Sequence, residues 1–185
     1  KNYTDFAVLY RTHTQSRVLE EKLRIYGIPY QIFGGMSFFA RKEIKDMVAY
    51  LTIYENPMAD TALTRIVNVP RRGIGDVSLQ KLRGFAAAHG FSLLEAMERA
   101  DEFMSGGRAK FASFLQTMDK IRASCEEKGV GEIVEAVFAA SGYQDMLMED
   151  ESIEGQTKIE NVEEFINSAY TYEKARGAFV RKEEN

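Results

Sequence analysis

The spacing of hydrophobic and polar residues changes near residue 40. Before that point, two short apolar runs, Phe6–Tyr10 and Tyr30–Phe33, are rich in strand-forming side chains. The segment 15–27 between them has its apolar residues at helical spacing and ends at a glycine. The order strand, helix, strand predicts a small parallel βαβ unit. Because two strands are too few for a stable sheet, we expect this unit to belong to a larger sheet outside the chain.

After residue 40 the apolar positions recur with the period of an α-helix. Ser92 and Glu95 have the spacing of a capping box, and so do Thr157 and Glu160. The chain of 185 residues, 45% of them hydrophobic, is long enough to bury a core. The fold is therefore predicted to be mainly α, preceded by the small α/β piece. The predicted helices cover residues 42–55, 60–69, 77–90, 92–100, 107–127, 131–142 and 157–175.

Composition excludes some classes of function. A formal net charge of −4 argues against a nucleic-acid binder that relies on bulk charge, although a local basic patch remains compatible with it. The single cysteine, Cys125, cannot form an internal disulfide, and its helical context favours a packed residue over a nucleophile. No apolar run reaches membrane-spanning length, and the N-terminus lacks the pattern of a signal peptide. These features predict a cytoplasmic protein.

The stretch NVPRRGIGDVSLQKL, residues 68–82, carries a local basic patch. From residue 65 to residue 83, five basic side chains accompany one acid, Asp76. Gly73 and Gly75 flank Ile74 between two predicted helices, an arrangement typical of a helix-hairpin-helix. We expect Ile74 to pack inward and the amides of 73–75 to point outward at the helix N-terminus, where a phosphate can bind. The alternative is a tight turn with a solvated basic surface, where Asp76 caps the helix.

Two further segments combine polar or basic side chains with aromatic ones. LYRTHTQSR, which follows the first apolar run, could contact a phosphate or a base, or could be an ordinary polar loop. In GGMSFFARKEIKD, Phe38 and Phe39 could stack on bases or belong to the core. His13 and His89 have no partner at metal-ligand spacing, so we expect no metal site. Since the P-loop pattern and other catalytic motifs are absent, we expect no catalytic residues and no cofactor in this chain.

Four segments in order then suggest a family. AVLYRTHTQSRVLEEKL, IPYQIFGGMSFFARKEIKDMVAYL, RIVNVPRRGIGDVSLQKL and GQTKIENVEEF together resemble the UvrD/PcrA/Rep family of superfamily 1 DNA helicases. The resemblance extends over nearly the whole chain. It implies residues 1–39 to be part of the RecA-like subdomain 2A and residues 40–185 to be most of the helical subdomain 2B.

That resemblance implies a function for the parent protein. It would be an ATP-dependent 3′-to-5′ DNA helicase of repair or replication that uses ATP and Mg²⁺, while this fragment, without a phosphate loop, would be inactive alone. Its partners would be DNA at duplex/single-strand junctions, together with repair or replication proteins. Two alternatives are a regulatory or protein-interaction module controlling the helicase, and part of a helicase–nuclease subunit.

The resemblance also implies particular DNA contacts. Histidine stands at position 13 where the family usually has asparagine, and Ser37 stands where it often has a basic residue. The residues implied to hold the duplex backbone are Arg71, Arg72, Gly73, Ile74, Gly75, Ser78 and Lys81. Those implied to contact the single strand are Arg11, Thr12, His13, Arg41 and Lys42.

Overall fold

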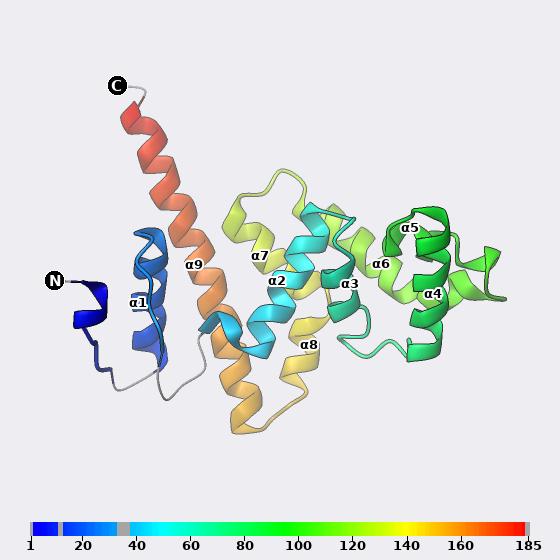
Figure 1. Ribbon diagram of the computed structural model, residues 1–185, viewed down its shortest axis with the longest axis horizontal. Coiled ribbons are helices and arrows are strands. Elements are labelled where there is room, and N and C mark those ends of the chain that lie inside the picture. Colours follow the sequence, from blue (N-terminus) through cyan, green and yellow to red (C-terminus); the bar gives the residue numbers. More distant parts are fainter. Residues whose placement is uncertain (1, 11–12, 33–37, 184–185) are drawn as a thin grey trace. The chain divides into compact units, whose positions relative to one another are not determined.

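The computed structural model describes residues 2–10, 13–32 and 38–183. The chain divides into two compact units, Lys1–Lys45 and Asp46–Asn185, and each is described by itself (Figure 1). The larger unit contains nearly all of the regular structure, so it carries most of the argument below.

The smaller unit is built around one α-helix. It contains the 3-10 turn η1 (Tyr3–Asp5), α1 (His13–Ile25), the 3-10 turn η2 (Phe38–Ala40) and the start of α2. α1 packs against η2. The carboxylate of Glu20 accepts hydrogen bonds from the Phe38 amide at 3.4 Å and from the Tyr30 hydroxyl at 3.3 Å. Phe38 is fully buried, which confirms the core interpretation for that ring.

The predicted βαβ unit is not observed in the part of the chain that the structure describes. Residues 6–10 and 30–32 form no strand, and Phe33 lies outside the described residues. The side chain of Leu9 is 96% exposed and that of Phe6 is 65% exposed. A strand is stabilised by hydrogen bonds to its neighbours and by a covered face, and neither described segment has such a neighbour within this unit. Apolar, β-branched sequence is therefore not sufficient to form a strand here.

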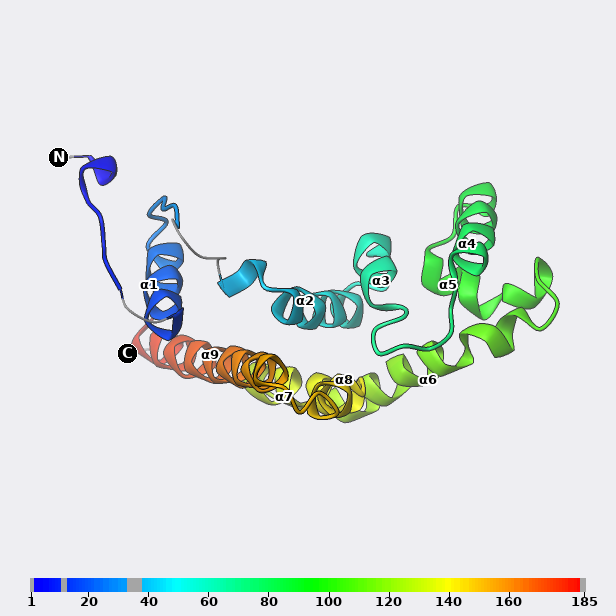
Figure 2. The ribbon, with the colours of Figure 1, turned by 90° about the horizontal axis from the view of Figure 1, so that it is seen from below.

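All regular structure in the described residues of the larger unit is helical, which confirms the prediction of a mainly α fold. α6 packs against α7, α7 and α8 both pack against the long α9, and α4 packs against α5. Figure 2 shows α6 running from the α4–α5 pair toward α7 and α8. The helices are α2 (Lys42–Glu55), α3 (Asp60–Ile66), α4 (Asp76–His89), α5 (Leu93–Glu98), η3 (Ala100–Glu102), α6 (Gly107–Cys125), α7 (Val130–Ala140), α8 (Tyr143–Met148) and α9 (Ile153–Glu183).

Helix ends follow the sequence signals in one case and not in another. At the start of α5, Ser92 Oγ accepts from the Glu95 amide at 3.2 Å, and the Glu95 carboxylate accepts from the Ser92 amide, so the predicted capping box is confirmed. The second predicted box is wrong, because α9 begins at Ile153 rather than near residue 157. Thr157 Oγ1 instead donates to the Ile153 carbonyl at 2.8 Å, as hydroxyls do inside helices.

The core of the larger unit is one continuous cluster. One face of α6 supplies Phe111, Phe114, Met118 and Ile121, all of them fully buried. Cys125 ends that face with 2% of its surface exposed, and burial raises the pKa of its thiol. The prediction that Cys125 is a packed residue is confirmed.

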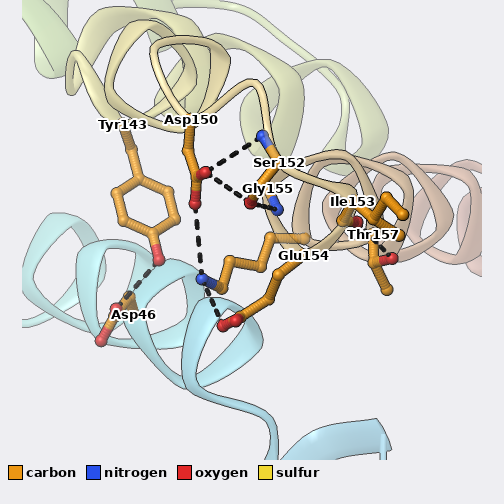
Figure 3. Close-up of polar contacts among 9 residues, drawn as sticks. Asp46, Tyr143, Asp150, Ser152, Ile153, Glu154, Gly155 and Thr157 are labelled. Atoms are coloured by element: carbon orange, nitrogen blue, oxygen red, sulfur yellow. Dashed lines mark hydrogen bonds and ion pairs between the residues drawn. The ribbon is translucent and has the colours of Figure 1, made fainter.

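Polar contacts connect α2 with α8 and fix the corner between α8 and α9 (Figure 3). The Tyr143 hydroxyl of α8 donates to Asp46 Oδ2 of α2 at 2.9 Å, and both residues are buried. At the α8–α9 corner, Asp150 accepts from the Ser152 hydroxyl at 2.6 Å. The contact between Asp150 and Ser152, with the close approach of Gly155 to the Asp150 carbonyl, fixes where α9 begins.

Candidate nucleic-acid interface

The basic stretch singled out from the sequence, residues 68–82, covers most of the segment 67–75, which connects α3 to α4, and the first half of α4. Gly73 has a φ of +69°, a conformation that glycine adopts without strain. Gly75 is extended, with a φ of −90°, and is the N-cap of α4. Ile74 between them is 2% exposed, which confirms its predicted inward packing. The segment is longer than the short turn of a helix-hairpin-helix, and that motif is not observed as such.

The two adjacent arginines have different environments. Arg71 is exposed, whereas Arg72 is partly buried and its side chain turns into the helical unit. The Arg72 guanidinium donates to the carbonyls of Ile66 at 3.3 Å, Pro70 at 3.1 Å and Ser141 at 3.1 Å. The charge expected to face a phosphate at Arg72 is therefore directed at protein oxygens.

Two side-chain oxygens complete the surroundings of Arg72. Its guanidinium donates to the Tyr50 hydroxyl at 3.0 Å and to Thr117 Oγ1 at 3.5 Å, and it lies 5.6 Å from the centre of the Phe114 ring. The Tyr50 hydroxyl in turn donates to the Val69 carbonyl. Burial raises the pKa of Tyr50, while the charge and hydrogen bond of Arg72 lower it in part. Tyr50 is therefore a neutral side chain beside the charged guanidinium of Arg72.

Asn68 organises the backbone of the segment. Its Oδ1 accepts from the Arg72 amide at 2.7 Å and from the Ile74 amide at 3.4 Å. The Ile74 amide therefore points toward Asn68, not outward as the sequence interpretation expects. The signal that could have identified this residue is the habit of asparagine to bond backbone groups a few positions along a turn.

The N-terminus of α4 remains accessible to a ligand, because Gly75 and Asp76 are exposed. Gly75 offers no side chain to cap the helix, and the first amides of any helix have no intrahelical acceptor. The Ser78 amide is already paired, because it donates to the Gly75 carbonyl at 3.0 Å. Asp76 stands in the first turn and contributes a negative charge there. An anion at this end would meet both the helix dipole and that carboxylate.

Three basic side chains are exposed on the same segment and helix. Arg71 precedes Gly73, while Lys81 and Arg83 lie on α4. Arg83 also donates to Thr64 Oγ1 at 3.4 Å. Arg65, counted in the patch from sequence, is paired with the buried carboxylate of Asp46 at 2.7 Å. Of the five basic side chains counted from the sequence, Arg72 and Arg65 are thus held by protein oxygens, and three remain for the exposed surface.

The residues expected to contact a single strand belong to the smaller unit. Arg11 and Thr12 lie outside the described residues, and His13 is the first residue of α1. Arg41 is partly buried, with its guanidinium 5.4 Å from the centre of the Phe38 ring, and Lys42 is exposed at the start of α2. Phe39 carries the guanidinium of Arg24 over its ring at 4.0 Å, so that face is already covered.

Metal sites, pockets and membrane-spanning helices are the other features to consider in the described part of the chain. Its His, Cys, Asp and Glu side chains include no group of three or more placed to hold a metal ion. A shallow pocket of about 310 Å³ lies between α3, α4 and α5, with Arg83, Thr64 and Phe91 among its lining residues. None of the helices in the described ranges is long and apolar enough to cross a membrane.

Comparison with known proteins gives one consistent answer. A family model described as the UvrD-like helicase C-terminal domain matches residues 1–183. The chain is 39% identical over 175 residues to the ATP-dependent DNA helicase PcrA of Bacillus subtilis strain 168. It is 38% identical over 176 residues to the protein of the same name from Staphylococcus aureus strain Mu50. Each alignment covers 94% of this chain and 24% of the relative, so the chain spans about a quarter of their length.

Proposed function

The chain belongs to the UvrD-like helicase C-terminal domain family, and we propose that it is a DNA-binding part of an ATP-dependent DNA helicase. In this proposal residues 40–185 form a 2B-type subdomain that grips the duplex backbone near the fork. Residues 1–39 belong to a RecA-like subdomain 2A, whose βαβ piece forms only with its neighbouring strands. The parent protein moves 3′ to 5′ along one strand, in the cytoplasm, during repair or replication.

The observation that carries this proposal is the exposed basic surface beside the uncapped N-terminus of α4. Arg71 lies in the segment that leads into that end, and Lys81 and Arg83 are exposed further along α4. Backbone amides at a helix N-terminus together with nearby basic side chains bind phosphate without reading the bases. Contact of this kind suits a subdomain that must bind duplex DNA of any base sequence.

The chain's own residues account for binding and not for hydrolysis. Its sequence has no P-loop pattern, so ATP and Mg²⁺ would be held by other segments of the helicase. We therefore expect the isolated chain to bind duplex DNA and to hydrolyse no ATP. ATP hydrolysis by a pure preparation of the chain would contradict this division of roles.

The experiment is fluorescence anisotropy with a labelled duplex, a forked DNA and a single strand over a salt series. We compare wild type with the double variant Arg71→Glu, Lys81→Glu. The matched control is Lys110→Glu, Lys120→Glu on α6, which reverses two exposed charges away from the segment. A duplex contact at the segment predicts at least about a tenfold loss for the first variant, on the order of two phosphate contacts, and little loss for the control.

Two results would count against the proposal. Wild type that binds no duplex at low salt would remove the DNA-gripping role and favour a regulatory or protein-interaction module. Equal losses of duplex affinity in the two double variants would mean that binding depends on net charge alone and is not localised at the segment 67–75.

A further inference from the structure

Arg72 joins the segment 67–75 to three other parts of the larger unit. Its acceptors are the Tyr50 hydroxyl on α2, Thr117 Oγ1 on α6, and the Ser141 carbonyl between α7 and α8. The same guanidinium also bonds the segment's own chain at the Pro70 carbonyl. A single side chain therefore ties the segment to helices that are distant from it in sequence.

These contacts use the donors that a phosphate would need. A guanidinium has five N–H donors in a planar fork, and here both terminal nitrogens donate to protein oxygens. Its centre lies near the buried ring of Phe114. Moving Arg72 to a phosphate would leave the Tyr50 hydroxyl and the carbonyls without this donor, which is costly inside a protein.

We infer that Arg72 is a positioning residue that holds the segment 67–75 in its DNA-binding form and does not itself contact phosphate. The inference rests on the proposed function and divides the two adjacent arginines by role. Arg71 faces the ligand, and Arg72 fastens the loop that presents Arg71 and the α4 N-terminus.

This role has a quantitative signature. If the segment is correctly placed in only a fraction of molecules, the apparent affinity falls by that fraction. The contacts in the complex stay the same, so the salt dependence of binding does not change. Loss of a direct phosphate contact behaves differently, because it makes the negative slope of log affinity against log salt shallower by about 0.9.

The variants that separate these cases are Arg72→Lys, Arg72→Gln, Tyr50→Phe, Arg71→Lys and Arg71→Gln. Arg72→Lys keeps the charge but loses the fork, and Tyr50→Phe removes one hydroxyl from a fully buried side chain that cannot touch DNA. Each is tested by anisotropy with a labelled duplex over a salt series, at a temperature where circular dichroism shows the variant folded.

We expect Arg72→Lys to bind about tenfold more weakly and Tyr50→Phe about threefold more weakly, each with the wild-type salt slope, since positioning bonds are lost and phosphate contacts are kept. Arg71→Lys should bind like wild type, and Arg71→Gln should make the salt slope shallower by about 0.9. If Arg72→Lys does not fold, Tyr50→Phe decides the question.

The inference is overturned if Arg72→Lys and Tyr50→Phe both bind like wild type. It is also overturned if Arg72→Gln makes the salt slope shallower as Arg71→Gln does, because Arg72 would then contact phosphate. Failure of the proposed function looks different: wild type itself would not bind duplex, or reversal of Arg71 and Lys81 would have no effect.

Discussion

The two compact units of the chain satisfy their backbones and apolar side chains in different ways. In residues 46–185, helices close their hydrogen bonds locally and bury one continuous core, with Leu63, Met118 and Val137 fully covered. In residues 1–45, Phe6, Val8 and Leu9 are more than half exposed. Helices can complete their main-chain hydrogen bonds alone, whereas a strand cannot, and apolar side chains are accordingly covered in the helical unit and exposed at residues 6–9.

The test with the largest expected effect truncates one leucine to alanine in each unit. Leu63→Ala removes a fully buried side chain, so we expect a loss of about 2–5 kcal/mol in the free energy of unfolding. Leu9→Ala acts on a side chain that is 96% exposed, and a change within about 0.5 kcal/mol is expected. Urea denaturation followed by circular dichroism measures both. Equal losses would mean that the apolar run at 6–10 is covered in solution.

The same contrast explains which parts of the fold the sequence predicts. The 3.6-residue period of α6 identifies its buried face correctly, because side chains on a helix gather by local geometry. The strands at 6–10 and 30–33 are predicted from side-chain type alone. Side-chain type indicates that a segment suits a sheet but does not supply the neighbouring strands.

In the candidate site, sequence identifies the backbone better than the side chains. The glycines flanking Ile74 correctly indicate a turn with a buried apolar residue. Nothing in the spacing of Arg71 and Arg72 distinguishes them, since they are adjacent and chemically identical. Their difference comes from Tyr50 and Ser141, which are distant in sequence and reach Arg72 only in the folded chain. That Arg71 contacts DNA and that Arg72 does not are both predictions.

A second test asks whether close packing in residues 46–185 extends to the α8–α9 corner. A Cβ added at Gly155 would collide with the Asp150 carbonyl oxygen, which belongs to the backbone and cannot move cheaply. We expect Gly155→Ala to lower the free energy of unfolding by about 1–3 kcal/mol. Thermal unfolding followed by circular dichroism measures the change.

Gly84 on α4 is the matched control for that substitution. It also lies within a helix, but a Cβ added there would meet no atom within 4 Å. Gly84→Ala should therefore raise stability by about 0.5–1 kcal/mol, because alanine loses less backbone entropy in a helix. Two alanine variants with the same sign of effect would show that the corner is looser than its geometry indicates.

The smallest expected effect concerns a polar contact at the surface of the same helical unit. The Tyr170 hydroxyl of α9 donates to Glu135 Oε2 of α7 at 2.7 Å, and this bond, with the nearby charges of Glu132 and Glu173, raises the pKa of Tyr170 to about 12. A tyrosine in the unfolded chain ionises near pH 10. The contact therefore favours the folded state fully below about pH 10 and is lost as the pH rises through about 12.

Tyr170→Phe isolates that contribution, because the other tyrosines, among them Tyr50 with its raised pKa, are unchanged. We expect wild type to lose more stability than the variant between about pH 10 and pH 12, measured by urea denaturation at each pH. The difference in tyrosinate absorbance between the two proteins should titrate at about 12. A difference that titrates near pH 10, the ordinary value for tyrosine, would mean that the Tyr170–Glu135 bond is not formed in solution and that α7 and α9 are held together without it, as the buried core of residues 46–185 would permit.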